Sequence, residues 1–154
     1  MAPLLNFRAA ISIAALAALL PCVAVARTHP GPAPADEYFG PFKQSILGIR
    51  NHITDFEAKA DAEFVPEKVL KGIDNLEVAI EDWHSQYPKD SWVPKFLDRI
   101  VHLYARAHST AHAQCTRALA LLKRDYKNTK FARDAQAVVA DEQTMPVPAT
   151  TSMP

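Results

Sequence analysis

The sequence has few of the residues on which small cross-linked or metal-built domains depend. Of its 154 residues only two are cysteines, which excludes a disulfide-rich scaffold and any zinc fold built on several cysteines. It also lacks an excess of either charge, because 17 Lys and Arg residues balance 17 Asp and Glu residues. Non-specific nucleic-acid binding requires a basic surface that displaces counterions, so nucleic acid is not an expected partner.

Motifs of catalysis are lacking too. The four glycines are isolated, at positions 31, 40, 48 and 72, so the sequence has no glycine-rich phosphate loop. It has no Gly-x-Ser-x-Gly, His-Glu-x-x-His or Cys-x-x-Cys motif and no EF-hand loop. Because no nucleophile, base and orienting group share a local pattern, we expect neither enzymatic activity nor a cofactor.

The N-terminus has the layout of a secretory signal peptide. A short segment with one positive charge precedes an apolar run from Ala9 to Leu20, and Ala24-Val25-Ala26 offers a small-residue cleavage site. The alternative is an uncleaved membrane anchor over residues 9–26, but Pro21 interrupts that run near the minimum spanning length of roughly 17–20 residues. We therefore predict that residues 1–26 are removed and that the protein is exported, to the periplasm or as a secreted protein.

Cleavage would leave Cys115 as the only cysteine, so no internal disulfide can form and packing must supply the stability. After residue 26 no apolar run is long enough to span a membrane, and we expect no stable insertion.

The rest of the chain divides into a helical domain with two irregular ends. Residues 27–37 carry three prolines and are predicted to form an extended linker. Residues 143–154 are rich in proline and threonine and are predicted to be a disordered tail. Between them, over residues 38–142, apolar residues recur at helical spacing, and no alternating run of strand length is present. The fold class is therefore predicted to be all-α.

The apolar spacing predicts about five helices. The first runs from Tyr38 or Pro41 to Ala60, with an apolar stripe of Phe39, Phe42, Ile46, Ile49, Ile53 and Phe56. The second runs from Pro66 to Tyr87, and the third follows a cap at Asp90 or Ser91. The fourth runs from near Ser109 to Tyr126, and the fifth runs from a cap at Thr129 to about Glu142.

Helices two and three correspond to helices four and five at an offset of 39 residues. Tyr87 then aligns with Tyr126, and Asp90 aligns with Thr129, so both turns and both caps are preserved. Two helical hairpins of one design are typical of an α-solenoid, in which each hairpin buries its face against a neighbour. The alternative is that any two amphipathic hairpins align at some offset.

The two turns carry a resemblance to a known family. Tyr87-Pro88-Lys89-Asp90-Ser91-Trp92 and Tyr126-Lys127-Asn128-Thr129-Lys130-Phe131 resemble the inter-helix turns of tetratricopeptide-like repeat proteins of the bacterial envelope, over about residues 66–142. The spacing of 39 departs from the 34-residue tetratricopeptide period, and the Trp…Leu-Gly…Tyr pattern is absent. The resemblance implies two stacked hairpins that form a binding scaffold, with the first helix outside the repeat.

Two sets of residues are candidates for a site. His108, His112 and Cys115 stand at i, i+4 and i+7, so on one continuous helix they would share a face and could bind zinc or copper; the alternative is that Cys115 is a small core residue. The candidates for partner binding are aromatic or basic residues, namely Trp83, Tyr87, Trp92, Lys43 and Arg50. For these the alternatives are a core cluster of aromatic residues and a solvated basic face.

We thus expect a non-catalytic scaffold of the cell envelope that binds a protein or peptide in a groove between hairpins. A small metal-binding protein and a structural component that forms homo-oligomers are the alternatives.

Overall fold

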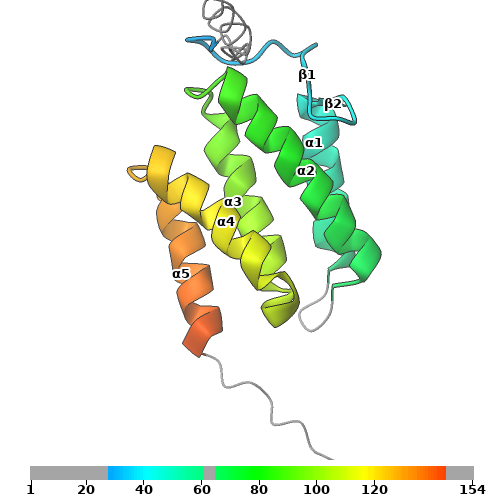
Figure 1. The fold of residues 1–154 in the computed structure, drawn as a ribbon, viewed down its shortest axis with the longest axis vertical. Helices are drawn as coiled ribbons and strands as arrows, with labels where there is room; N and C mark the ends of the chain where they lie inside the picture. Colours follow the sequence, from blue (N-terminus) through cyan, green and yellow to red (C-terminus); the bar gives the residue numbers. More distant parts are fainter. Residues whose placement is uncertain (1–27, 61–64, 145–154) are drawn as a thin grey trace, which may run out of the picture.

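Apolar residues three and four positions apart produce five helices. The computed structural model describes residues 28–60 and 65–144, with the helices α1 (Ile46–Lys59), α2 (Glu67–Gln86), α3 (Trp92–Ala105), α4 (His112–Asp125) and α5 (Lys130–Thr144) (Figure 1). The all-α prediction is confirmed. The predicted signal peptide lies outside the described residues, as does the predicted tail except for residues 143 and 144, which belong to α5. No helix in the described ranges is long and apolar enough to cross a membrane.

The first helix begins later than the sequence predicts. Residues 38–45 form a β-hairpin in which β1 (Tyr38–Phe39) pairs antiparallel with β2 (Gln44–Ser45). Gly40 and Lys43 in the turn have φ angles of 68° and 52°, which an α-helix cannot contain. Ser45 then caps α1, because its Oγ accepts a hydrogen bond from the third residue of the helix at 3.1 Å. The predicted start at Tyr38 or Pro41 is therefore wrong, and Phe42, predicted to face inward, is 62% exposed.

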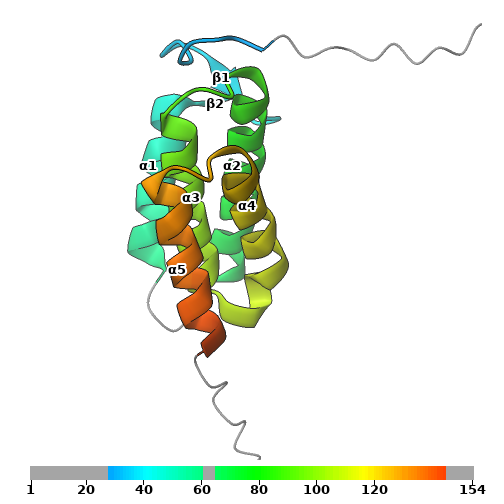
Figure 2. The same cartoon turned by 90° about the vertical axis from the view of Figure 1, so that its left-hand side faces the viewer.

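Helix α3 lies at the centre of the domain. It packs against α1, α2, α4 and α5. The helices form two layers, one of α1, α3 and α5 and one of α2 and α4 (Figures 1 and 2). The apolar stripe of α3 is accordingly buried in full: Val93, Phe96, Leu97, Ile100, Tyr104. The hairpin of α4 and α5 thus stacks on the hairpin of α2 and α3 mainly through α3.

The two inter-helix turns are built alike. Tyr87 and Tyr126 each donate their backbone N–H to the carbonyl four residues earlier, at 2.8 and 2.9 Å. Asp90 and Thr129 then donate their N–H groups to the carbonyls of these tyrosines, at 3.0 and 2.9 Å. Their side chains accept a backbone N–H from the next helix, at 2.9 and 3.2 Å. Asp90, rather than Ser91, therefore caps α3, and Thr129 caps α5 as predicted.

The proline-rich residues 28–37 lie across the end of α2 and contact it (Figure 1). The N–H of His29 donates to the carbonyl of Gln86 at 2.7 Å, and the N–H of Ala33 donates to the carboxylate of Asp90 at 2.9 Å. The described part of the predicted linker is therefore attached to the helical domain.

Candidate functional site

A groove runs between α2 and α4, which are the first helices of the two hairpins. Its volume is about 510 Å³, and it is lined by Glu81, His84, Arg117, Ala120, Leu121 and Arg124. The α4 residues stand at i, i+3, i+4 and i+7, so they form one helical face. On this face the apolar residues Ala120 and Leu121 lie between the two arginines. Glu81 and His84 stand three residues apart on α2 and form the opposite wall.

A buried carboxylate fixes the first arginine. Glu77 is only 1% exposed, and it accepts hydrogen bonds from Nε and Nη2 of Arg117 at 3.0 and 2.6 Å. The Tyr104 hydroxyl, from α3, lies 2.8 Å from the same carboxylate and 2.7 Å from that of Asp74. A two-bond Arg–carboxylate pair holds the guanidinium plane in one orientation. This network therefore connects α2, α3 and α4 beneath the groove.

His84 lies on the α2 wall of the groove, and both of its ring nitrogens have a partner. Nε2 lies 2.9 Å from Oδ2 of Asp125, and Nδ1 lies 2.8 Å from the hydroxyl of Tyr126. That hydroxyl is also 3.1 Å from the carbonyl of Pro88, to which it donates. His84 therefore connects the end of α4 to the turn between α2 and α3. Burial lowers the pKa of His84, although the Asp125 carboxylate acts in the opposite direction.

Glu81 is the acidic group of the groove. Burial, together with the neighbouring Glu77 carboxylate, raises the pKa of Glu81, while Arg117 opposes that rise. Arg124, at the other end of the α4 face, is paired with the adjacent Asp125. The groove thus offers hydrogen-bond donors on the α4 wall and a carboxylate on the α2 wall, beside the apolar Leu121.

The structure separates the aromatic residues predicted to bind a partner. Trp83 and Tyr87 are buried, with Trp83 stacked on Phe39 at 5.2 Å between ring centroids. Neither presents a surface to a partner, so for these two residues the core alternative holds. Trp92 is 44% exposed and remains accessible, with the Lys95 ammonium 4.4 Å from its ring centroid.

The two basic candidates for partner binding, Lys43 and Arg50, do not share a helical face. Lys43 lies in the hairpin turn, whereas Arg50 lies on α1, and both are exposed. Residues seven positions apart lie on the same helical face only when both belong to one helix. Lys43 precedes the helix, so this spacing does not bring the two side chains together.

The possible metal ligands are also spread over two elements. His108 belongs to a 3₁₀ turn, η1 (His108–Ala111), so the α-helical spacing to His112 is lost. His112 is exposed and Cys115 is buried, so the two do not face one space. Burial raises the pKa of the Cys115 thiol to about 11, which disfavours the thiolate that a metal requires. Among the described residues, no three His, Cys, Asp or Glu side chains form a group that could hold a metal.

None of the residues that line the groove was among the site residues predicted from the sequence. The signal that points to them is Glu77, a carboxylate within the apolar stripe of α2 between Ile73 and Ile80. A charged residue at a core position requires a partner of opposite charge, and on α4 the facing cation is Arg117.

In comparisons with known proteins, the chain matched no family model, no curated protein and no solved structure.

Proposed function

We propose that this protein is an exported, non-catalytic scaffold that binds a protein or peptide segment in the groove between α2 and α4. The observation that carries the proposal is the arrangement of polar groups around that groove. An extended peptide presents N–H and C=O groups on both edges, and the groove has the Arg117 and Arg124 guanidinium groups on one wall and the Glu81 carboxylate on the other.

The way these groups are held favours recognition over catalysis. The guanidinium of Arg117 is oriented by Glu77 before any ligand arrives, which lowers the entropy that binding costs. His84, the natural candidate for proton transfer, has both nitrogens bonded to Asp125 and Tyr126. The matching turns of the two hairpins also agree with the resemblance to tetratricopeptide-like scaffolds.

The test is selection of peptides from a displayed random library against the full exported protein, followed by anisotropy titration of the selected peptides. We expect Glu81→Ala and Arg124→Ala to weaken binding about tenfold or more, since each removes a polar contact in a partly desolvated site. Arg133→Ala, an exposed arginine on α5 outside the groove, is the matched control and should bind like the wild type. Failure to select any peptide, or binding that ignores the groove variants, would contradict the proposal.

A further inference from the structure

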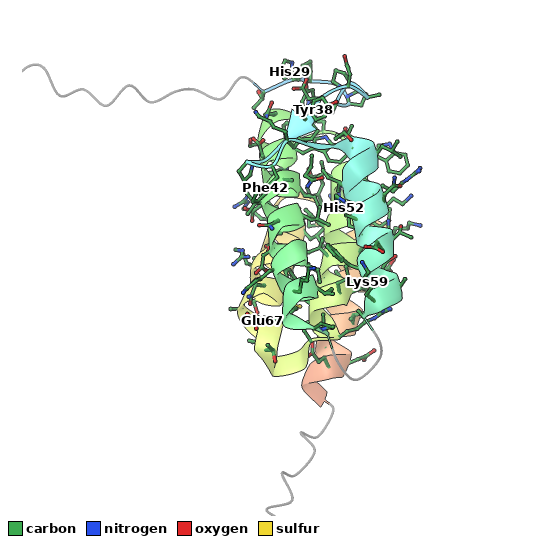
Figure 3. All side chains as sticks on the ribbon, turned by 90° about the vertical axis from the view of Figure 1, so that its right-hand side faces the viewer. His29, Tyr38, Phe42, His52, Lys59 and Glu67 are labelled. Carbon is green, nitrogen blue, oxygen red and sulfur yellow. The ribbon has the colours of Figure 1, made fainter. Side chains whose placement is uncertain are left out.

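Large apolar side chains are exposed at one end of the molecule. The hairpin end is defined here as residues 28–47 together with residues 87–96 at the turn between α2 and α3. Among the described residues, the exposed large apolar side chains are Tyr38, Phe42, Leu47, Val78 and Trp92. All except Val78 belong to the hairpin end, and Figure 3 shows Tyr38 and Phe42 on this part of the molecule, away from Lys59 and Glu67 at the opposite end.

The exposed turn of the hairpin is firmly attached at its base. Phe39 is fully buried between the hairpin and α2, where it stacks on Trp83. The N–H of Gly40 donates to the carboxylate of Asp82 at 2.7 Å. Phe42 therefore projects into solvent from a fixed position, and its exposure is not the result of a loosely attached loop.

The charges of the hairpin end are divided between its surface and its interior. Lys43, Lys89 and Lys95 are exposed. The Asp90 carboxylate is buried and accepts three hydrogen bonds, and Glu37 accepts one from the Tyr87 hydroxyl. Lysines thus face solvent, while two of the three carboxylates of this end are engaged within the fold and Asp36 is exposed.

The chain enters the described fold at this same end. His29 is bonded to Gln86 and stacks on Tyr87 at 4.7 Å, beside Tyr38 in Figure 3. Cleavage after Ala26 would begin the chain with Arg27, the residue that directly precedes the described part of this end in the sequence. A retained apolar segment would instead tether the same end to a membrane. The exposed aromatic side chains and lysines of this end fit the interfacial region and the anionic phosphates of a lipid surface.

We propose that the hairpin end binds the surface of a membrane that contains anionic lipids. Phe42 and Trp92 enter the interfacial region, where aromatic side chains are favoured, and the three lysines lie at the lipid phosphates. The groove between α2 and α4 is a separate site, so this inference does not depend on the proposed peptide binding.

The test is co-sedimentation of the exported protein with vesicles of phosphatidylcholine alone or with about one third phosphatidylglycerol, at low and high salt. We expect binding to the anionic vesicles only, weakened by salt. Phe42→Ser should reduce the partition coefficient about tenfold or more, because it removes the apolar contact. The double variant Lys43→Glu and Lys89→Glu should abolish binding.

A matched control carries the same change of charge at the opposite end. Lys68→Glu and Lys71→Glu lie in the first turns of α2, away from the hairpin end, and should bind like the wild type. Thermal unfolding of each variant checks that its fold is intact. Absence of wild-type binding at low salt, or an equal loss in the control, would overturn the proposal. So would a photoreactive residue at position 42 that forms adducts with a protein and none with lipid.

Discussion

At the scale of single residues, Glu77 and Asp90 are the two buried charged side chains among the described residues, and each joins separate parts of the fold. Glu77 holds Tyr104 of α3 and Arg117 of α4. Asp90 accepts hydrogen bonds from the indole N–H of Trp83, the backbone of α3 and the N–H of Ala33. A buried carboxylate is tolerated only when its partners are in place, so both residues make the fold sensitive to loss of a partner.

Removing Arg117 should destabilise the protein more than removing the whole pair. Arg117→Met leaves the Glu77 carboxylate buried without its cation and should cost about 2 kcal/mol. This is below the range of about 3–5 kcal/mol for a fully buried pair, because the arginine side chain is 54% exposed. The double variant Arg117→Met and Glu77→Met removes the buried charge and should recover part of that loss. Urea unfolding of the three proteins checks this, and equal stability of single and double variants would contradict it.

Gly40 is required by both its conformation and its surroundings. Its φ is 68°, and a Cβ at this position would lie 2.9 Å from the Cα of Ala79 on α2. Gly40→Ala should therefore destabilise the protein by about 2–3 kcal/mol through backbone strain and overpacking. Gly31→Ala, which would meet nothing within 4 Å, is the control and should be nearly neutral in thermal unfolding.

The pKa values of two histidines should lie on opposite sides of 6.5, the ordinary value for the side chain. The Asp98 carboxylate, whose Oδ1 lies 3.3 Å from Nε2 of His102, raises the pKa of His102, whereas burial lowers the pKa of His84. For His102 the stabilisation is complete below 6.5 and is lost as the pH rises through the folded-state pKa. For His84 the folded state is penalised as the pH falls below 6.5.

NMR titration of the imidazole resonances checks both directions. Assignment follows from His84→Gln and His102→Gln, each of which removes one resonance. The His84 variant should also lose less stability on acidification than the wild type, because it has no imidazole to charge. A His84 pKa above that of His102 would contradict this account.

At the scale of elements, α2 and α3 are predictable from the sequence because large apolar residues recur along each at a spacing of three or four residues, and the structure buries them. The β-hairpin is not predictable. Its strands have two residues each, too short for an alternating pattern, and Phe39 and Phe42 also fit a helical stripe. The positive φ angles of Gly40 and Lys43 make this segment a hairpin turn instead of a helix.

The two helix caps at the turns offer a comparison within one protein. Asp90→Ala removes the acceptor of three hydrogen bonds in a buried position and should cost about 3 kcal/mol. Thr129→Ala, at the equivalent position of the second turn, removes one capping bond and should cost about 1 kcal/mol. Hydrogen exchange adds a local readout, since only Asp90→Ala should expose the amide of Ala33. Equal costs for the two variants would show that the extra bonds of Asp90 contribute nothing.

At the scale of the whole molecule, the sequence predicted the helices but not the site. The aromatic candidates Trp83 and Tyr87 proved to be core residues, because a cluster of aromatics at helical spacing has the same pattern in a core and on a surface. The groove depends on how α2 and α4 align across α3, and that alignment is a property of tertiary packing. Glu77, a charge within the apolar stripe of α2, is the sequence signal that could have led to the groove, and it was not among the predicted site residues.

The measurement that tests the central claim most directly is site-specific photo-cross-linking in the native exported fraction. A photoreactive residue replaces Ala120, which lines the groove, or Ala137, an exposed control position on α5. The account predicts one discrete adduct at position 120 that disappears when Arg124→Ala is added, and no such adduct at position 137. Adducts of equal yield at both positions, or one at position 120 that survives the loss of Arg124, would contradict it.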